Sequence, residues 1–244
     1  MQLIILASGK GSRLNYKIKV PKIFIKIKNK TLFDLNKKFY SFFKKRIIIL
    51  GYGYKNCAKI LKNQNFKILK NDIYYKTNMV HSLFCAKKQI NDDVLICYGD
   101  IFFDWKIINQ LNIKKDKENL IILKENWLSL WKKRMGLKDI FNDAEDLKVK
   151  NKKLISIGEK INEKLPKLQF MGILKLNKES FFKLSKFYSR IKNNNIDFTS
   201  FLNQAMKKKI INIKYTKTKK FWFEVDNKKD LRILTKYIND KKII

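Results

Sequence analysis

The sequence predicts an α/β protein with a doubly wound, mostly parallel sheet and helices on both faces. Short apolar runs rich in β-branched residues alternate with longer helical stretches in the first half of the chain. These runs are apolar throughout, as expected for strands that are buried on both faces of a sheet. Two prolines and eight glycines mark no linker, so we expect one domain over residues 1–244.

The first half of the chain carries the clearest strand and helix signals. Strands are expected at Leu3–Leu6, Ile47–Leu50, Phe66–Leu69 and Val94–Tyr98. Helices are expected at Leu32–Lys45, Lys55–Asn63 and Thr77–Ile90. Because strands and helices alternate along the chain, neighbouring strands are expected to run parallel.

The alternation of predicted strands and helices becomes less regular after residue 100. Further strands are expected at Leu120–Leu123, Leu154–Ile157 and Phe170–Leu176. Residues 126–153 form a polar, tryptophan-rich segment without a clear period. Two helices follow the last of these strands, and Asn227 is placed to cap a final helix that begins at Lys228.

The net charge of +35 raises nucleic acid as a partner, but the kind of charge argues against it. Only five of the 56 basic residues are arginine, which usually recognises phosphates and base edges. The 51 lysines are spread along the whole chain beside abundant isoleucine and asparagine, which indicates a compositional bias. We therefore expect no nucleic-acid partner and keep a basic nucleic-acid-binding protein as a remote alternative.

No membrane segment is expected. Residues 1–9 are apolar, but no basic region precedes them and no small-residue cleavage site follows. Other apolar runs fall short of the roughly 18 residues that a spanning helix needs, so we expect a cytoplasmic protein. The three cysteines form no C-x-x-C pair and His81 is the only histidine, so zinc is not expected.

A glycine-rich loop directly follows the first expected strand. Its residues are Leu6-Ala7-Ser8-Gly9-Lys10-Gly11-Ser12-Arg13-Leu14, with Pro21-Lys22 further along. Gly9 and Gly11 leave room for backbone N–H groups to approach a phosphate, and Arg13 and Lys22 supply positive charge. Leu14 stands where a dinucleotide fingerprint has its third glycine, and the Gly-Lys-Ser/Thr of a P-loop is absent. The loop therefore predicts a nucleotide phosphate site outside those two folds.

Two carboxylates from distant segments are candidates for a metal site. Asp100 follows the strand Val94–Tyr98, at the same sheet edge as the glycine loop. Alternation within residues 221–226 puts Glu224 and Asp226 on one side of a strand, with Asp226 at its end. Asp100 and Asp226 can hold a magnesium ion whose shell phosphate oxygens complete. The alternatives are that Asp100 only opens a turn and that Asp226 caps the last helix.

Ordered motifs extend over nearly the whole chain. They are L-A-x-G-x-G-S-R-L, P-K, T-N-M-V-x-S-L at Thr77–Leu83, G-D at Gly99–Asp100 and W-x-E-V-D at Trp222–Asp226. This set resembles the nucleotidyltransferases of the phosphocholine cytidylyltransferase type, relatives of the sugar-phosphate nucleotidyltransferases. The resemblance continues through residues 127–134, 142–145, 157–160 and 169–175. The resemblance implies a nucleotide-diphospho-sugar transferase-like fold. It also implies an enzyme that joins a phosphorylated small molecule to the CMP part of CTP and releases pyrophosphate.

The resemblance also implies roles for single residues. Lys22 and Arg13 would be catalytic, because they neutralise charge where the nucleophile meets the triphosphate, and Asp100 and Asp226 would bind magnesium. The nucleotide would contact Ala7, Gly9, Gly11, Ser12, Asn78 and Ser82, the last two at its base or ribose. A phosphate or phosphonate nucleophile is largely ionised at pH 7, so the reaction needs no catalytic base.

The acceptor pocket is expected around the tryptophan-rich segment. Aromatic faces together with carboxylates hold cationic head groups such as choline, whereas core packing equally explains the helical spacing of Trp127 and Trp131. Lys160 and Arg134 are alternatively candidates to bind the acceptor's phosphate. The candidate acceptor residues are Trp131, Arg134, Glu145, Lys160 and Trp222, with Trp127 and Phe170 from the same segments.

These observations predict a magnesium-dependent CTP:phosphoacceptor cytidylyltransferase that serves the decoration of a surface polysaccharide. The acceptors that the resemblance allows are phosphocholine, phosphonates and amino-acid phosphates, among which we favour phosphoglutamine. A sugar-1-phosphate nucleotidyltransferase is the alternative enzyme. The sequence leaves the acceptor and the oligomeric state open.

Overall fold

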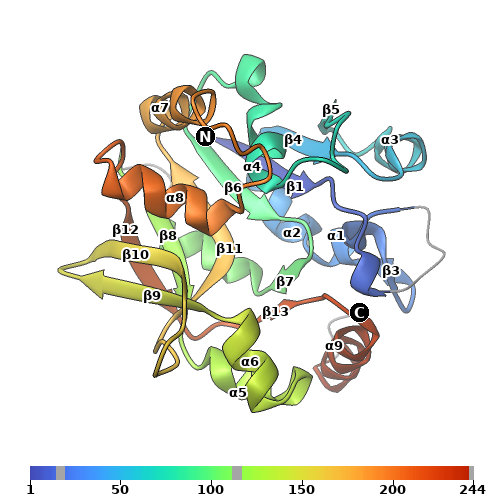
Figure 1. Cartoon of the computed structure of the whole chain (residues 1–244). Coiled ribbons are helices and arrows are strands. Elements are labelled where there is room, and N and C mark those ends of the chain that lie inside the picture. Colours follow the sequence, from blue (N-terminus) through green and yellow to red (C-terminus); the bar gives the residue numbers. More distant parts are fainter. Residues whose placement is uncertain (15–19, 112–116, 242–244) are drawn as a thin grey trace.

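The computed structural model describes residues 1–14, 20–111 and 117–241 (Figure 1). The strands of its main sheet are β1 (Gln2–Ala7), β4 (Lys45–Leu50), β5 (Lys67–Lys70), β6 (Val94–Tyr98), β8 (Leu120–Lys124), β9 (Glu145–Lys150), β10 (Lys153–Lys160), β11 (Gln169–Leu176) and β12 (Lys214–Thr218). Within the described residues the sheet order is β5-β4-β1-β6-β11-β8-β12-β10-β9.

The strand directions confirm the predicted fold class. The pairs β5–β4, β4–β1, β1–β6 and β8–β12 are parallel. β11 runs against both of its neighbours, and so does β10. All other strands of the sheet point the same way, so the sheet is mixed but mostly parallel.

Helices cover both faces of this sheet (Figure 1). They are α1 (Leu32–Leu35), α2 (Lys37–Tyr40), α3 (Tyr54–Leu61), α4 (Met79–Phe84), α5 (Trp127–Arg134), α6 (Leu137–Asp143), α7 (Lys178–Tyr188), α8 (Phe198–Lys207) and α9 (Lys228–Asp240). Among the described residues, no helix combines the length and the apolar character that crossing a membrane requires.

The two largest core clusters lie one on each face of the main sheet, because side chains alternate along the buried strands. Leu3 and Ile5 of β1 contribute to the cluster that α1, α2, α3, α5 and α6 complete. Ile4 and Leu6 contribute to the other cluster, which α4, α7 and α8 complete. The continuous apolar character of the strand at the N-terminus therefore follows from burial on both sides.

A two-stranded sheet brings the chain's C-terminal part to the edge where β1 and β6 end. β7 (Ile101–Phe103) and β13 (Trp222–Glu224) pair antiparallel, with Glu224 opposite Ile101. The Val225 N–H donates to the Asp100 carbonyl oxygen at 2.9 Å. α9 begins directly afterwards, and Asn227 caps it as predicted, with its side chain accepting from the N–H groups of Lys229 and Asp230.

Two predicted helices are shorter in the structure. The segment predicted as helix over Leu32–Lys45 forms α1 and α2, which meet at Asn36, and Lys45 already belongs to β4. The Asn36 amide donates to the carbonyl oxygens of Leu32 and Ile101, so a buried side chain ties the break to β7. The segment predicted as helix over Thr77–Ile90 contains α4 and then a 3₁₀ turn at Lys87–Gln89.

Candidate active site

The glycine-rich loop leaves β1 and turns back over Lys22. Gly11 has φ +65°, a left-handed conformation that favours glycine, and a Cβ there would lie 2.8 Å from Cγ of Lys22. The Leu14 N–H donates to the Gly11 carbonyl oxygen at 3.0 Å, which closes the turn. Gly11 is therefore required both by the backbone and by the path of the lysine side chain.

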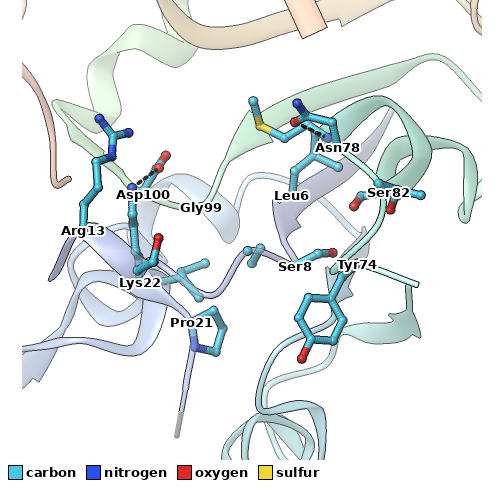
Figure 2. Close-up of a pocket in the computed structure, with 17 residues that line it drawn as sticks. Leu6, Ser8, Arg13, Pro21, Lys22, Tyr74, Asn78, Ser82, Gly99 and Asp100 are labelled. Atoms are coloured by element: carbon cyan, nitrogen blue, oxygen red, sulfur yellow. Dashed lines mark hydrogen bonds and ion pairs between the residues drawn. The ribbon is translucent and has the colours of Figure 1, made fainter. Parts of the chain in front are cut away.

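This loop forms one wall of a cavity of about 280 Å³ (Figure 2). All the residues that the sequence assigned to the nucleotide lie around it, as do the two catalytic candidates and Asp100. These lining residues are Ala7, Gly9, Gly11, Ser12, Arg13, Lys22, Asn78, Ser82 and Asp100. Tyr74 and Thr77 also line the cavity, although the sequence analysis gave them no role of their own.

Lys22 lies between two carboxylates that are far apart in the sequence. Its Nζ atom is 3.0 Å from Oδ2 of Asp100 and 2.6 Å from Oδ1 of Asp226. Burial alone would lower the pKa of Lys22, but the carboxylates of Asp100 and Asp226 outweigh it, and the pKa lies above its ordinary value. Lys22 is therefore fixed as a cation at the centre of the site.

Three carboxylates converge next to Lys22. Oxygens of Asp100, Glu224 and Asp226 all lie within 4.8 Å of one another. Burial and the neighbouring charges of Asp226 and Asp100 raise the pKa of Glu224 to about 8. Hard oxygen donors crowded in this way fit a magnesium ion, which would relieve their mutual repulsion.

Glu224 was not among the metal ligands predicted from the sequence. The alternation along β13 had placed it on the same side as Asp226, and that pattern was the available signal. Asp226 does not cap α9, because Asn227 has that position. Asp100 does lie in a turn, but the Asp100 carboxylate also belongs to the cluster of three carboxylates.

Arg134 contacts the carboxylate cluster from its buried side. Its side chain is 1% exposed and contacts Oδ2 of Asp226 at 3.0 Å and Oδ1 of Asp230 at 2.9 Å. Its Nη1 atom lies 3.7 Å from Oε2 of Glu224. Asp230, which the sequence analysis did not single out, in turn accepts from the backbone N–H of Asp226. With these partners Arg134 orients the cluster, and because it lines neither of the two cavities of the site it is not placed to bind an acceptor phosphate, unlike our expectation.

A second cavity of about 190 Å³ adjoins the first, and Arg13 and Met79 line both. Four of the residues expected near the acceptor line it, namely Trp131, Glu145, Phe170 and Trp222. Lys160 does not, because it lies exposed at the end of β10. Trp127 lines neither cavity: it packs edge-to-face on Trp131, donates its indole N–H to the Pro166 carbonyl oxygen and belongs to the core.

The second cavity is acidic in a strongly basic chain. Asp143, Glu145, Asp197, Glu224 and Asp226 line it, and no lysine is found among its described lining residues. The Thr199 hydroxyl lies 2.7 Å from Oε1 of Glu145 and 3.0 Å from Oδ1 of Asp197. Burial raises the pKa of Glu145, and the charge of Asp197 adds to that effect. This cavity suits a ligand with a positive charge.

The glycine-rich loop, a half-buried lysine and three carboxylates lie together at one sheet edge, beside a second cavity. This arrangement is that of a nucleotidyltransferase. Residues 3–127 match the family model described as the MobA-like NTP transferase domain. The chain belongs to this family. The matched part includes the glycine-rich loop, Lys22 and Asp100, whereas Glu224 and Asp226 lie beyond it.

Individual relatives extend the similarity over the whole chain. The CTP:phosphoglutamine cytidylyltransferase of Campylobacter jejuni is 32% identical over 259 aligned residues, covering 96% of this chain and 98% of that protein. The inositol-1-phosphate CTP transferase of T. maritima has the same fold, with a TM-score of 0.76 at 17% identity over 99% and 96% of the two chains. The CTP:phosphocholine cytidylyltransferase of Streptococcus pneumoniae has a TM-score of 0.74 at 17% identity over 97% and 98%.

Proposed function

We propose that the protein transfers a cytidylyl group from CTP to a small phosphorylated acceptor that carries an ammonium group, with phosphoglutamine as the first candidate. The observation that carries this proposal is the junction of the two cavities. The nucleotide loop, Lys22 and Asp100 line one cavity, and the acidic wall with Glu145 lines the other. The C. jejuni relative, which is named for phosphoglutamine, supports this choice of acceptor.

The reaction is an in-line displacement at the α-phosphorus of the nucleotide. An ionised oxygen of the acceptor's phosphoryl group forms the new P–O bond, and the bond to the bridging oxygen of the β-phosphate breaks, so pyrophosphate leaves with the electron pair. Because two anions must meet, the main task is to screen charge and to hold the partners in line. Lys22, which lines the nucleotide cavity, and Arg13, which lines both cavities, supply that screening.

Asp100, Glu224 and Asp226 would hold the magnesium ion. When bound, magnesium supplies charge neutralisation and orients the phosphate oxygens. Arg134 would keep the Asp226 carboxylate in place from its buried side, and Asp230 holds both Arg134 and the Asp226 backbone N–H. Lys22, which contacts two of the three carboxylates, stays beside the reacting phosphates.

The acidic cavity supports recognition of an ammonium group. Glu145 and Asp197, bridged by the Thr199 hydroxyl, offer two carboxylates to a cation. The indole N–H groups of Trp131 and Trp222 are buried without a hydrogen-bond partner in the described part of the chain. Together they would receive an ammonium and an oxygen on one molecule, a combination found in an amino-acid head group.

The test is pyrophosphate release with CTP and magnesium over a panel of acceptors. The panel contains phosphoglutamine, N-acetylated phosphoglutamine, phosphocholine, aminoethylphosphonate and hexose 1-phosphates. We expect phosphoglutamine to be the best acceptor and N-acetylation to lower its kcat/KM at least about tenfold, since it removes the ammonium charge. Preferential turnover of hexose 1-phosphates, or equal turnover of the acetylated compound, would contradict the proposal.

The product of this reaction would be a CDP-activated compound. Following the resemblance of the motifs, we propose that it serves the decoration of a surface polysaccharide. We also propose the cytoplasm as the compartment, because CTP is supplied there.

A further inference from the structure

A short chain of hydrogen bonds lies behind one wall of the nucleotide cavity. Its centre is Asn71, which is 1% exposed and is not among the residues that line the cavity. Asn71 follows β5, and its N–H donates to the Leu50 carbonyl oxygen at 2.8 Å. Its side chain contacts Thr77 and Ser82, which both line the cavity.

The hydrogen-bond partners fix the orientation of the Asn71 amide. Its Oδ1 atom accepts from the backbone N–H of Ile73 at 3.1 Å. Since a backbone N–H can only donate, the oxygen must face Ile73 and the NH₂ group must face the other way. Nδ2 therefore donates to Oγ1 of Thr77 at 3.1 Å and to Oγ of Ser82 at 3.0 Å.

The hydrogen-bond partners also define the roles of the Thr77 and Ser82 hydroxyl groups. Thr77 receives a hydrogen bond from Asn71 and donates its own hydrogen to the Ile73 carbonyl oxygen at 3.0 Å. Ser82 also receives a hydrogen bond from Asn71, but within the described residues its hydroxyl hydrogen has no protein acceptor. Ser82 lines the cavity, and Figure 2 shows it beside Asn78, on the opposite side of the view from Arg13 and Lys22. Of the two hydroxyl groups bound by Asn71, Ser82 is thus the one whose hydrogen stays available to a ligand in the cavity.

We infer that Asn71 is a positioning residue that holds the Ser82 hydroxyl as a donor toward N3 of the pyrimidine. N3 is an acceptor in cytosine and carries a hydrogen in uracil, so this donor favours CTP over UTP. A site built to make a buried hydrogen bond discriminates strongly against a ligand that cannot complete it. This inference rests on the proposed use of CTP, and it adds a physical reason why CTP would bind in preference to UTP.

Asn71→Asp tests the inference with almost no change in size. The carboxylate still accepts from the Ile73 N–H, but when ionised it cannot donate, so it takes the Ser82 hydrogen and turns the Ser82 lone pairs toward the base. The measured quantity is the dissociation constant of UTP divided by that of CTP, obtained by calorimetry at about pH 8 without an acceptor. We expect this ratio to fall at least about tenfold, with UTP binding gained or retained and CTP binding lost.

A matched control is Asn119→Asp. Asn119 has the same arrangement, because its Oδ1 atom accepts from the Asn177 N–H and its Nδ2 atom donates to Oγ of Ser180 and to a backbone carbonyl oxygen. It lines neither cavity of the site. We expect Asn119→Asp to leave the UTP to CTP ratio unchanged, even if it lowers the melting temperature as much as Asn71→Asp does.

Ser82→Ala provides a second path if Asn71→Asp folds poorly. It should lower the preference for CTP by itself, and Asn71→Asp should then have no further effect on the ratio in the Ser82→Ala background. Equal losses of CTP and UTP binding in Asn71→Asp, or wild-type protein that binds both equally, would overturn the inference. Because the readout is binding, the acceptor reaction can fail while this inference stands.

Discussion

Nζ of Lys22 lies 2.6 Å from Oδ1 of Asp226, although 204 positions separate the two residues in the sequence. The contact joins the P-K motif after the glycine-rich loop to the last residue of the W-x-E-V-D motif. The pairing of β7 with β13 makes it possible, because that pairing carries Asp226 to the edge where β1 and β6 end. Two motifs at opposite ends of the chain therefore form one site.

Removal of the Lys22 ammonium should slow the reaction without unfolding the protein. In Lys22→Ala the charge that screens the approaching anions is lost, so we expect kcat to fall by about 10²-fold or more. Pyrophosphate release measures this, and circular dichroism verifies the fold. Lys26→Ala, an exposed lysine on β2 (Lys26–Ile27), is the control. Near-normal turnover of Lys22→Ala would end the catalytic assignment.

Arg134 should matter for stability more than for acceptor binding. Arg134→Met leaves the buried Asp230 without its cationic partner and removes one of the cations around Asp226, and breaking such a buried pair costs about 3–5 kcal/mol. Urea unfolding should show this loss, whereas the exposed control Arg190→Met should stay within about 0.5 kcal/mol of wild type. If Arg134→Met is as stable as wild type but has a raised KM for the acceptor, the original acceptor assignment is right.

Glu224 should be a third magnesium ligand. Glu224→Gln replaces a carboxyl group, which can give up its proton when a cation binds, with an amide that cannot become charged, in a cluster whose oxygens lie within 4.8 Å of one another. We expect the half-saturating magnesium concentration for turnover to rise about tenfold, because magnesium prefers carboxylate oxygen. Glu179→Gln, on the surface of α7, is the matched control and should not change it. An unchanged magnesium requirement in Glu224→Gln would limit the site to the two aspartates.

Acceptor binding should weaken as the pH falls. The pKa of Glu145 lies above its ordinary value because the carboxyl is buried, so it takes up a proton at a higher pH than an exposed glutamate. Protonation removes the charge that faces the ammonium, and the acceptor KM should rise as the pH is lowered from 7.5 toward about 5. The acceptor's own phosphate titrates in the same range, so the comparison with Glu145→Gln is decisive. In Glu145→Gln the acceptor KM should be high over the whole pH range and should depend less steeply on pH than in the wild type. If the acceptor KM of both proteins changes with pH in the same way, this role of Glu145 is excluded.

Local sequence patterns were sufficient for much of the fold and for bringing the proposed nucleotide residues around one cavity. Buried strands such as β1 and β6 are recognisable in the sequence as apolar runs, and Gly11 and Lys22 belong to motifs that are close together in the sequence. The reversed direction of β11 could not be read from the chain, because strand direction depends on pairing with distant partners. The break at Asn36 depends on a contact with Ile101 that helical periodicity does not contain.

The acceptor side was harder to predict for the same reason. Arg134 and Lys160 are both cations in motif segments, yet one is buried against three carboxylates and the other is exposed on β10. Asp197 and Thr199 come from the start of α8 and reach Glu145 of β9 only through the folded structure. No short motif marks them, so the acidic cavity emerged from the structure alone.

The most direct test of the account is mass spectrometry of the product formed from CTP, magnesium and phosphoglutamine by the purified protein. We predict a compound that carries CMP joined to the acceptor through a phosphate bridge, with one pyrophosphate released for each product. Formation of a nucleotide sugar from a hexose 1-phosphate, with no CMP adduct of phosphoglutamine, would contradict the account.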